Sequence, residues 1–147
     1  MLNEEATYKD ILIDYYRNPR NYGRIENAKI ISKDANPLCG DEVEIFINVD
    51  NEKISEAKFV GNGCIISIAA TSLLLEKILN ADLNHVLKLD KEFILQLLGI
   101  DLSPIRLKCA LLPLKALKLG VCKFLSYGNF NLENQSKKLA KKLSNLS

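Results

Sequence analysis

Residues 43–64 read VEIFINVDNEKISEAKFVGNGC, and this stretch predicts the centre of a β-sheet and the start of a helix. In residues 43–49, aliphatic side chains alternate with polar or aromatic ones, which is typical of a strand with one buried face. Residues 50–52 predict a turn, and residues 54–60 then supply a second strand, so we expect an antiparallel hairpin. The stretch closes on Gly61-Asn62-Gly63-Cys64, where the hydrophobic period changes to that of a helix.

The flanking sequence predicts one further strand and several helices. Residues 8–17 have helical periodicity that stops at Asn18-Pro19, and residues 28–32 form a possible edge strand. After the hairpin, apolar spacing predicts helices over residues 65–79, 90–98, 110–124 and 133–143. Because a helix, then strands, then helices follow one another, we expect an α+β domain with a three-stranded antiparallel sheet packed by about five helices.

The composition fits a single globular domain. The chain has 147 residues, 48% hydrophobic and 26% charged, with a net charge of +2. We therefore treat residues 1–147 as one domain with a basic amphipathic tail over residues 132–147. Only this tail is basic, and the chain has no Trp, so we expect no nucleic-acid binding.

Nothing in the sequence resembles a signal peptide or a membrane span. We therefore expect a cytoplasmic protein with no membrane role. In a reducing compartment, its four cysteines should be free thiols, metal ligands or nucleophiles rather than disulfides.

Two cysteines lie at joints between predicted elements. Cys39 belongs to a turn that enters a strand, followed by Gly40, which permits close backbone approach or a positive φ. Asp41 then offers a carboxylate oxygen beside the Cys39 thiol. Cys64 follows two glycines of a tight turn and begins a helix, whose dipole favours the thiolate.

The other two cysteines have different surroundings. Cys109 is expected to open the helix that follows Pro104, and the helix dipole with Arg106 and Lys108 should lower its thiol pKa. Cys122 lies inside the same predicted helix among apolar residues, so we expect it in the core.

Three cysteines at such positions suggest one shared site. Each of Cys39, Cys64 and Cys109 could alone be an inert buried thiol, and no C-x-x-C spacing marks a zinc finger. Together with Asp41, however, they could converge on one metal or iron–sulfur site, provided that the folded domain brings three loops together.

Four motifs link these positions to a known family. They are Tyr16-Arg17-Asn18-Pro19-Arg20-Asn21, Asn36-Pro37-Leu38-Cys39-Gly40-Asp41, Gly61-Asn62-Gly63-Cys64-Ile65-Ile66-Ser67 and Lys108-Cys109-Ala110. With them in this order, the sequence resembles the U-type iron–sulfur cluster assembly proteins: the IscU, SufU and N-terminal NifU family. The resemblance covers roughly residues 8–124.

The resemblance implies a function for the four site residues. Cys39, Asp41, Cys64 and Cys109 would hold a transient [2Fe–2S] cluster on a scaffold that takes sulfur from a cysteine desulfurase and passes the cluster to apoproteins. Cys39 and Cys109 are the candidate persulfide acceptors. The alternative is a zinc-dependent sulfurtransferase of the SufU kind, with Zn²⁺ on the same four residues. A purely structural zinc module is a third possibility, which the carboxylate ligand disfavours.

The resemblance leaves the branch of the family open. IscU proteins carry a histidine where this chain has Lys108, and SufU proteins share its lysine but carry an insertion that this chain lacks. His85 is expected to be an ordinary solvent-exposed residue. Leu102-Ser103-Pro104-Ile105-Arg106 resembles the IscU loop that binds an Hsp70-type chaperone, which makes such a chaperone a candidate partner.

Overall fold

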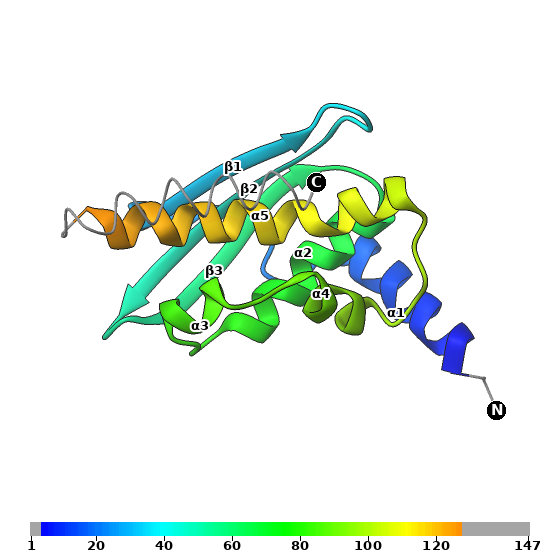
Figure 1. The fold of residues 1–147 in the computed structure, drawn as a ribbon, viewed down its shortest axis with the longest axis horizontal. Coiled ribbons are helices and arrows are strands. Elements are labelled where there is room, and N and C mark those ends of the chain that lie inside the picture. The colour runs from blue at the N-terminus through cyan, green and yellow to red at the C-terminus, as the bar shows by residue number, and fades with distance from the viewer. Residues whose placement is uncertain (1–3, 128–147) are drawn as a thin grey trace.

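The computed structural model describes residues 4–127, in which one helix precedes three strands and four helices follow (Figure 1). The elements are α1 Glu4–Arg17, β1 Ile30–Asn36, β2 Asp41–Asp50, β3 Lys53–Asn62, α2 Ile65–Ile78, α3 Leu83–Leu87, α4 Lys91–Leu98 and α5 Pro104–Ser126. The expected α+β class, with a three-stranded antiparallel sheet and five helices, is confirmed.

The hairpin predicted from residues 43–64 forms the central and one outer strand of the sheet. The strand order is β1-β2-β3, and β2 pairs antiparallel with both neighbours. Asp50 pairs with Lys53, and the two residues between them, Asn51 and Glu52, have φ values of 52° and 64°. Two positive φ angles define a tight hairpin turn whose twist matches that of the strands.

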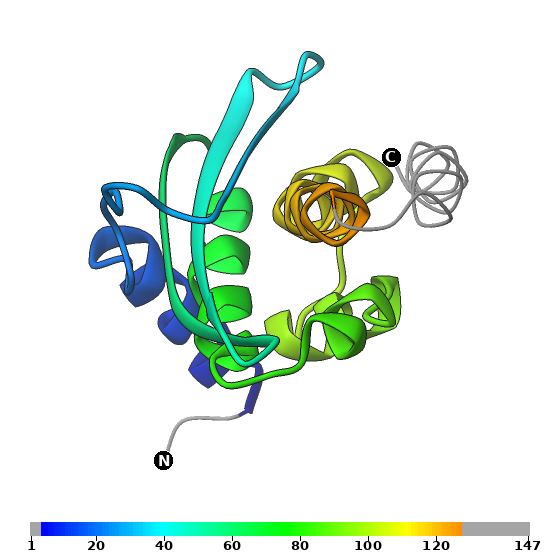
Figure 2. The same cartoon turned by 90° about the vertical axis from the view of Figure 1, so that its left-hand side faces the viewer.

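The core lies between the sheet and two helices. The aliphatic residues of β2 are buried: Val43, Ile45, Ile47 and Val49. Most of α2 is buried beside β3, and α5 crosses the sheet beside β1 and β2 (Figure 2). The contact with β1 is close, since a Cβ on Gly120 would lie 2.8 Å from Ile30 Cγ2.

Three boundaries differ from the sequence predictions. Helix α1 begins at Glu4, and β1 covers Ile30–Asn36 rather than residues 28–32. Helix α5 begins at Pro104 rather than at residue 110, because the Ser103 side chain caps it by accepting a hydrogen bond from the Arg106 N–H at 3.4 Å.

One short helix is a further difference from the sequence predictions. Helix α3 has five residues, too few for a periodic pattern, and was not predicted. The expected helix over residues 133–143 lies outside the described residues, as does the tail over 132–147. Among the described helices, none combines the length and apolar character needed to cross a membrane.

Candidate metal centre

The loop between β1 and β2 presents Cys39. Asn36 and Asp41 pair across the two strands, so the chain reverses over the residues between them. The Gly40 N–H donates to the Asn36 carbonyl at 2.9 Å, and Gly40 has a φ of 75°, a conformation that favours glycine. Cys39 is therefore exposed at the end of a closed turn, as the sequence indicated.

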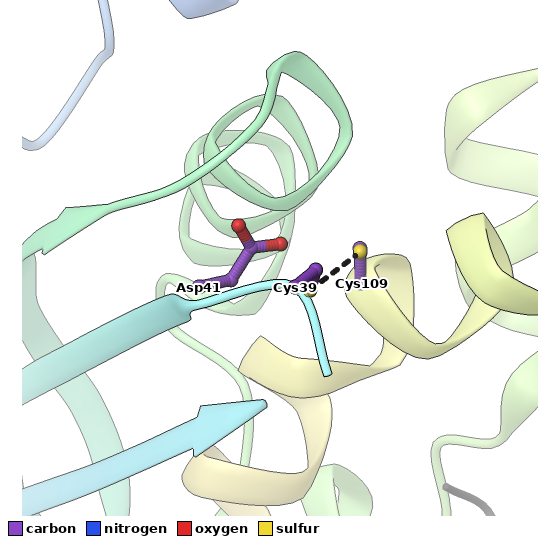
Figure 3. A group of neighbouring side chains, drawn as sticks. All are labelled: Cys39, Asp41 and Cys109. Carbon is purple, nitrogen blue, oxygen red and sulfur yellow. Dashed lines mark hydrogen bonds between the residues drawn. The ribbon is translucent and has the colours of Figure 1, made fainter. Parts of the chain in front are cut away.

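Cys109 approaches this loop from α5. Its Sγ lies 3.2 Å from Cys39 Sγ (Figure 3). Cys109 is in the second turn of α5 and is 0% exposed, so it does not open the helix as predicted. Burial raises the pKa of the Cys109 thiol above its ordinary value, and its hydrogen bonds to Cys39 and Asp41 raise it further. The prediction of a lowered pKa is therefore wrong.

Asp41 connects the β1–β2 loop to the start of α2. It is the first residue of β2 and only 2% exposed. Its Oδ1 accepts a hydrogen bond from the Cys64 N–H at 3.1 Å, and its Oδ2 lies 3.5 Å from Cys64 Sγ. Burial acts to raise the pKa of Asp41, but hydrogen bonds from Cys109, Cys39 and Cys64 outweigh it and lower this pKa.

Cys64 is the N-cap residue of α2, as the sequence predicted. The two glycines before it permit close packing rather than a positive φ. A Cβ on Gly61 would lie 2.4 Å from the Glu42 carbonyl oxygen, and a Cβ on Gly63 would lie 2.2 Å from Ser67 Oγ. A side chain at position 61 would therefore clash with the backbone of β2, and one at position 63 would displace the Ser67 hydroxyl.

The structure thus brings the four predicted site residues together, three of them most closely. Ligand atoms of Cys39, Asp41 and Cys109 all lie within 4.8 Å of one another, which makes them a candidate metal-binding group. Cys64 lies next to this group, with its Sγ 3.5 Å from Asp41 Oδ2. Thiolates with one carboxylate suit zinc, and thiolates are the usual ligands of iron–sulfur clusters.

Of the remaining residues considered in the sequence, Cys122 and His85 lie away from the ligand atoms, and Lys108 lies beside the Cys39 loop. Cys122 is buried in the core, which confirms its prediction. His85 is exposed on α3, next to the β2–β3 turn and so at the opposite end of β2 from Cys39. Half-buried Lys108 lines a pocket of about 210 Å³ beside the Cys39 loop.

One residue of the site was not singled out in the sequence. Ser67 is 3% exposed, and its N–H donates to Cys64 Sγ at 3.4 Å. The signal was its position three residues after the N-cap residue, where side chains commonly take part in capping.

An apolar groove opens beside Cys64. Its volume is about 570 Å³, and it runs between α1, the start of α2 and the chain leading into α5. Its lining includes Ile13 and Tyr16 of α1, Ile65 of α2, and Leu102 and Arg106.

Comparison with known proteins assigns the chain to a family. The model of the NifU-like N-terminal domain matches residues 7–129. Over 138 residues the chain is 33% identical to a Bacillus subtilis (strain 168) protein named zinc-dependent sulfurtransferase SufU, a match that covers 82% of this chain and 93% of that protein.

Two further relatives carry scaffold names. The chain is 32% identical over 126 residues to the Haemophilus influenzae protein named iron–sulfur cluster assembly scaffold protein IscU, which covers 80% of this chain and 94% of that one. A crystal structure from Fervidobacterium islandicum AW-1, assigned as a SUF-system scaffold protein, has a TM-score of 0.68 and 30% identity and covers 81% of this chain and 99% of that chain. The resemblance carried by the four motifs is thereby confirmed, and the chain belongs to the NifU-like N-terminal domain family.

Proposed function

We propose that this protein is an iron–sulfur cluster assembly scaffold. It receives sulfur from a cysteine desulfurase, binds iron, and transfers a [2Fe–2S] cluster to apoproteins. The observation that carries the proposal is the convergence of Cys39, Asp41 and Cys109 within 4.8 Å, with Cys64 in contact with Asp41. Free thiols at such a site fit a reducing compartment, so we place the protein in the cytoplasm.

The donor set suits a cluster that is built and then released. Three thiolates would hold iron, and Asp41 is a harder, weaker partner for it than a fourth thiolate would be. The exposed loop of Cys39 lets a recipient protein approach the cargo directly.

Among the candidate sulfur acceptors, exposure favours Cys39 over Cys109. The Cys39 thiolate would attack the terminal sulfur of the desulfurase persulfide, forming a new S–S bond while the desulfurase cysteine leaves as its thiolate. No electron is gained or lost in this step, whereas later reduction to sulfide needs an external electron donor. Cys109 is 0% exposed and would first have to move.

A zinc-dependent sulfurtransferase is the second candidate function. It is favoured by Lys108 in place of a histidine and by the similarity to the Bacillus protein of that name. Cys39, Asp41, Cys64 and Cys109 would hold the zinc, which would keep the thiols deprotonated when bound. A purely structural zinc module fits less well, because Cys39 is exposed and one ligand is a carboxylate.

One experiment separates the two functions. The protein is purified anaerobically, its iron and zinc are measured, and it is then given desulfurase, cysteine, ferrous iron and a reductant. A visible cluster spectrum that a chelator abolishes supports the scaffold. Tight zinc, no cluster and faster desulfurase turnover would support the transferase. A protein that binds neither metal and accepts no sulfur would contradict both.

The proposed chaperone partner would meet a helix start rather than a free loop. Pro104, Ile105 and Arg106 belong to α5, and the Ile105 side chain is 63% exposed. An Hsp70-type chaperone that binds extended peptide would therefore have to unwind the first turn of α5. Binding of the wild-type protein, compared with Ile105→Asp, tests this contact.

A further inference from the structure

The Cys64 sulfur occupies a position where helices usually place an oxygen. At the N-cap of α2, Cys64 Sγ accepts a hydrogen bond from the Ser67 N–H at 3.4 Å. Serine, threonine, aspartate or asparagine normally supplies this acceptor. The Ser67 hydroxyl lies 3.8 Å from the same sulfur and donates to the Cys64 carbonyl at 3.2 Å.

Asp41 also contacts Cys64. One carboxylate oxygen accepts from the Cys64 N–H, and the other faces Cys64 Sγ at 3.5 Å. The backbone N–H and the thiol of Cys64 therefore both contact Asp41 of β2, and the thiol also contacts Ser67 in the first turn of α2. Cys39, by contrast, lies exposed on a turn.

The space for the Ser67 hydroxyl depends on glycine at position 63. A Cβ on Gly63 would lie 2.2 Å from Ser67 Oγ and 3.0 Å from Asp41 Oδ1, so a side chain at position 63 would displace the Ser67 hydroxyl. Thr71 Oγ1 donates to the Ser67 carbonyl at 2.7 Å within the buried helix. The first turn of α2 is therefore firmly held.

We propose that the Ser67 hydroxyl, which lies 3.8 Å from the Cys64 sulfur and donates to the Cys64 carbonyl at 3.2 Å, is a positioning group that holds this sulfur beside Asp41. Cys64 then stays in place as a ligand while Cys39 exchanges sulfur. The proposal rests on the proposed function, in which Cys64 is a ligand. Hydrogen-bond partners behind metal ligands typically change metal affinity by about 10- to 100-fold when removed.

The first test measures Co²⁺ binding, without sulfur or partner proteins. Ser67→Ala is compared with Ser72→Ala, which removes another buried α2 hydroxyl, one bonded to the backbone of Arg20. We expect Ser67→Ala to weaken Co²⁺ binding about tenfold or more and to shift the sulfur-to-cobalt absorption band. Ser72→Ala should keep the wild-type affinity and spectrum. Equal affinities in wild type and Ser67→Ala, or equal losses in both variants, would overturn the proposal.

A second measurement uses metal-free protein. The Hα–Hβ couplings of Cys64, measured by NMR, should report one side-chain rotamer in the wild type and in Ser72→Ala but averaging in Ser67→Ala. If Ser67→Ala does not fold, Gly63→Ala displaces the same hydroxyl and should give the same averaging. A single unchanged rotamer in the variant would refute the role of Ser67. A wild-type protein that binds no Co²⁺ would instead contradict the proposed function, and the couplings would then decide the role of Ser67 alone.

Discussion

The three sulfurs of the site are graded in exposure, and this grading assigns them different work. Cys39 is exposed, Cys64 is half-buried at the N-cap of α2, and Cys109 is buried. An exposed thiol can meet a partner's persulfide, whereas buried thiols are better suited to hold a ligand in place. Cys122 shares the burial of Cys109, but it is not part of the candidate metal-binding group found among the described residues.

Serine substitutions test this division at single residues. We expect Cys39→Ser, Cys64→Ser and Cys109→Ser to abolish metal binding and cluster formation, because each removes a thiolate ligand. Cys122→Ser should retain both, with only a modest loss of stability from placing a hydroxyl in the core. Metal content and cluster absorbance provide the measurement. Loss of activity in Cys122→Ser alone would contradict the site assignment.

At the scale of elements, the start of α5 shows what could be read from the sequence. The sequence predicts a helix over residues 110–124, which would place Pro113 near its start, where a proline is tolerated. The structure begins α5 at Pro104, capped by Ser103, and keeps Pro113 in its interior. Pro113 has no N–H to donate to the Cys109 carbonyl four residues earlier. Local propensity argued against such a proline, and packing against the sheet overrode it.

The sequence predicts the strands of the hairpin more accurately than the start of α5, but it does not reveal what the hairpin's glycines contact. Strand alternation identified β2 and β3 because it depends on one buried face. The sequence also marked Gly61 and Gly63 as special, but for a turn. Only the fold reveals that Gly61 faces the Glu42 carbonyl and Gly63 faces Ser67, since both neighbours are contributed by other elements or turns.

Replacement of Gly61 tests whether the end of the β2–β3 pair positions the site. A methyl group there would meet backbone atoms, with Glu42 O at 2.4 Å and Val43 Cα at 3.2 Å, so the strands must separate. We expect Gly61→Ala to lower the free energy of unfolding by about 1–3 kcal/mol and to weaken zinc binding. Urea denaturation and a chelator competition measure the two effects. Ser55→Ala, at an exposed position of the same strand, should leave both nearly unchanged.

The contact between α1 and α2 gives stability a pH dependence. The Tyr15 hydroxyl donates to Glu76 Oε2 at 2.8 Å, and the Arg20 guanidinium lies 3.9 Å from the centre of the Tyr15 ring. Burial raises the pKa of Tyr15, and the hydrogen bond to Glu76 raises it further. The unfolded phenol loses its proton near pH 10, roughly its ordinary pKa, while the folded one retains it. Stability from this contact is therefore complete below about pH 10 and falls above it.

Tyr15→Phe should reduce this alkaline loss. We expect the urea midpoint of the wild type to fall more steeply between about pH 9 and pH 11 than that of the variant, around the ordinary phenol pKa. Tyr127→Phe, at an exposed position near the end of α5, serves as the matched control and should follow the wild type. Parallel curves for wild type and Tyr15→Phe would contradict the linkage.

For the whole molecule, the site joins three segments that are distant in the chain. Its proposed ligands come from the β1–β2 loop and the first residue of β2, from the N-cap of α2, and from the second turn of α5. A ligand that binds only the folded state stabilises it, by about 4 kcal/mol at a free concentration one thousand times its Kd. For a chain of this size, each kcal/mol raises the melting temperature by roughly 2–4 °C.

Zinc should therefore raise the melting temperature by roughly 10 °C, and a chelator should reverse the rise. Cys122→Ser should keep this shift, whereas Cys109→Ser should lose it because α5 is then no longer joined to the other two segments. A shift that survives in Cys109→Ser would mean that zinc binds elsewhere on the chain.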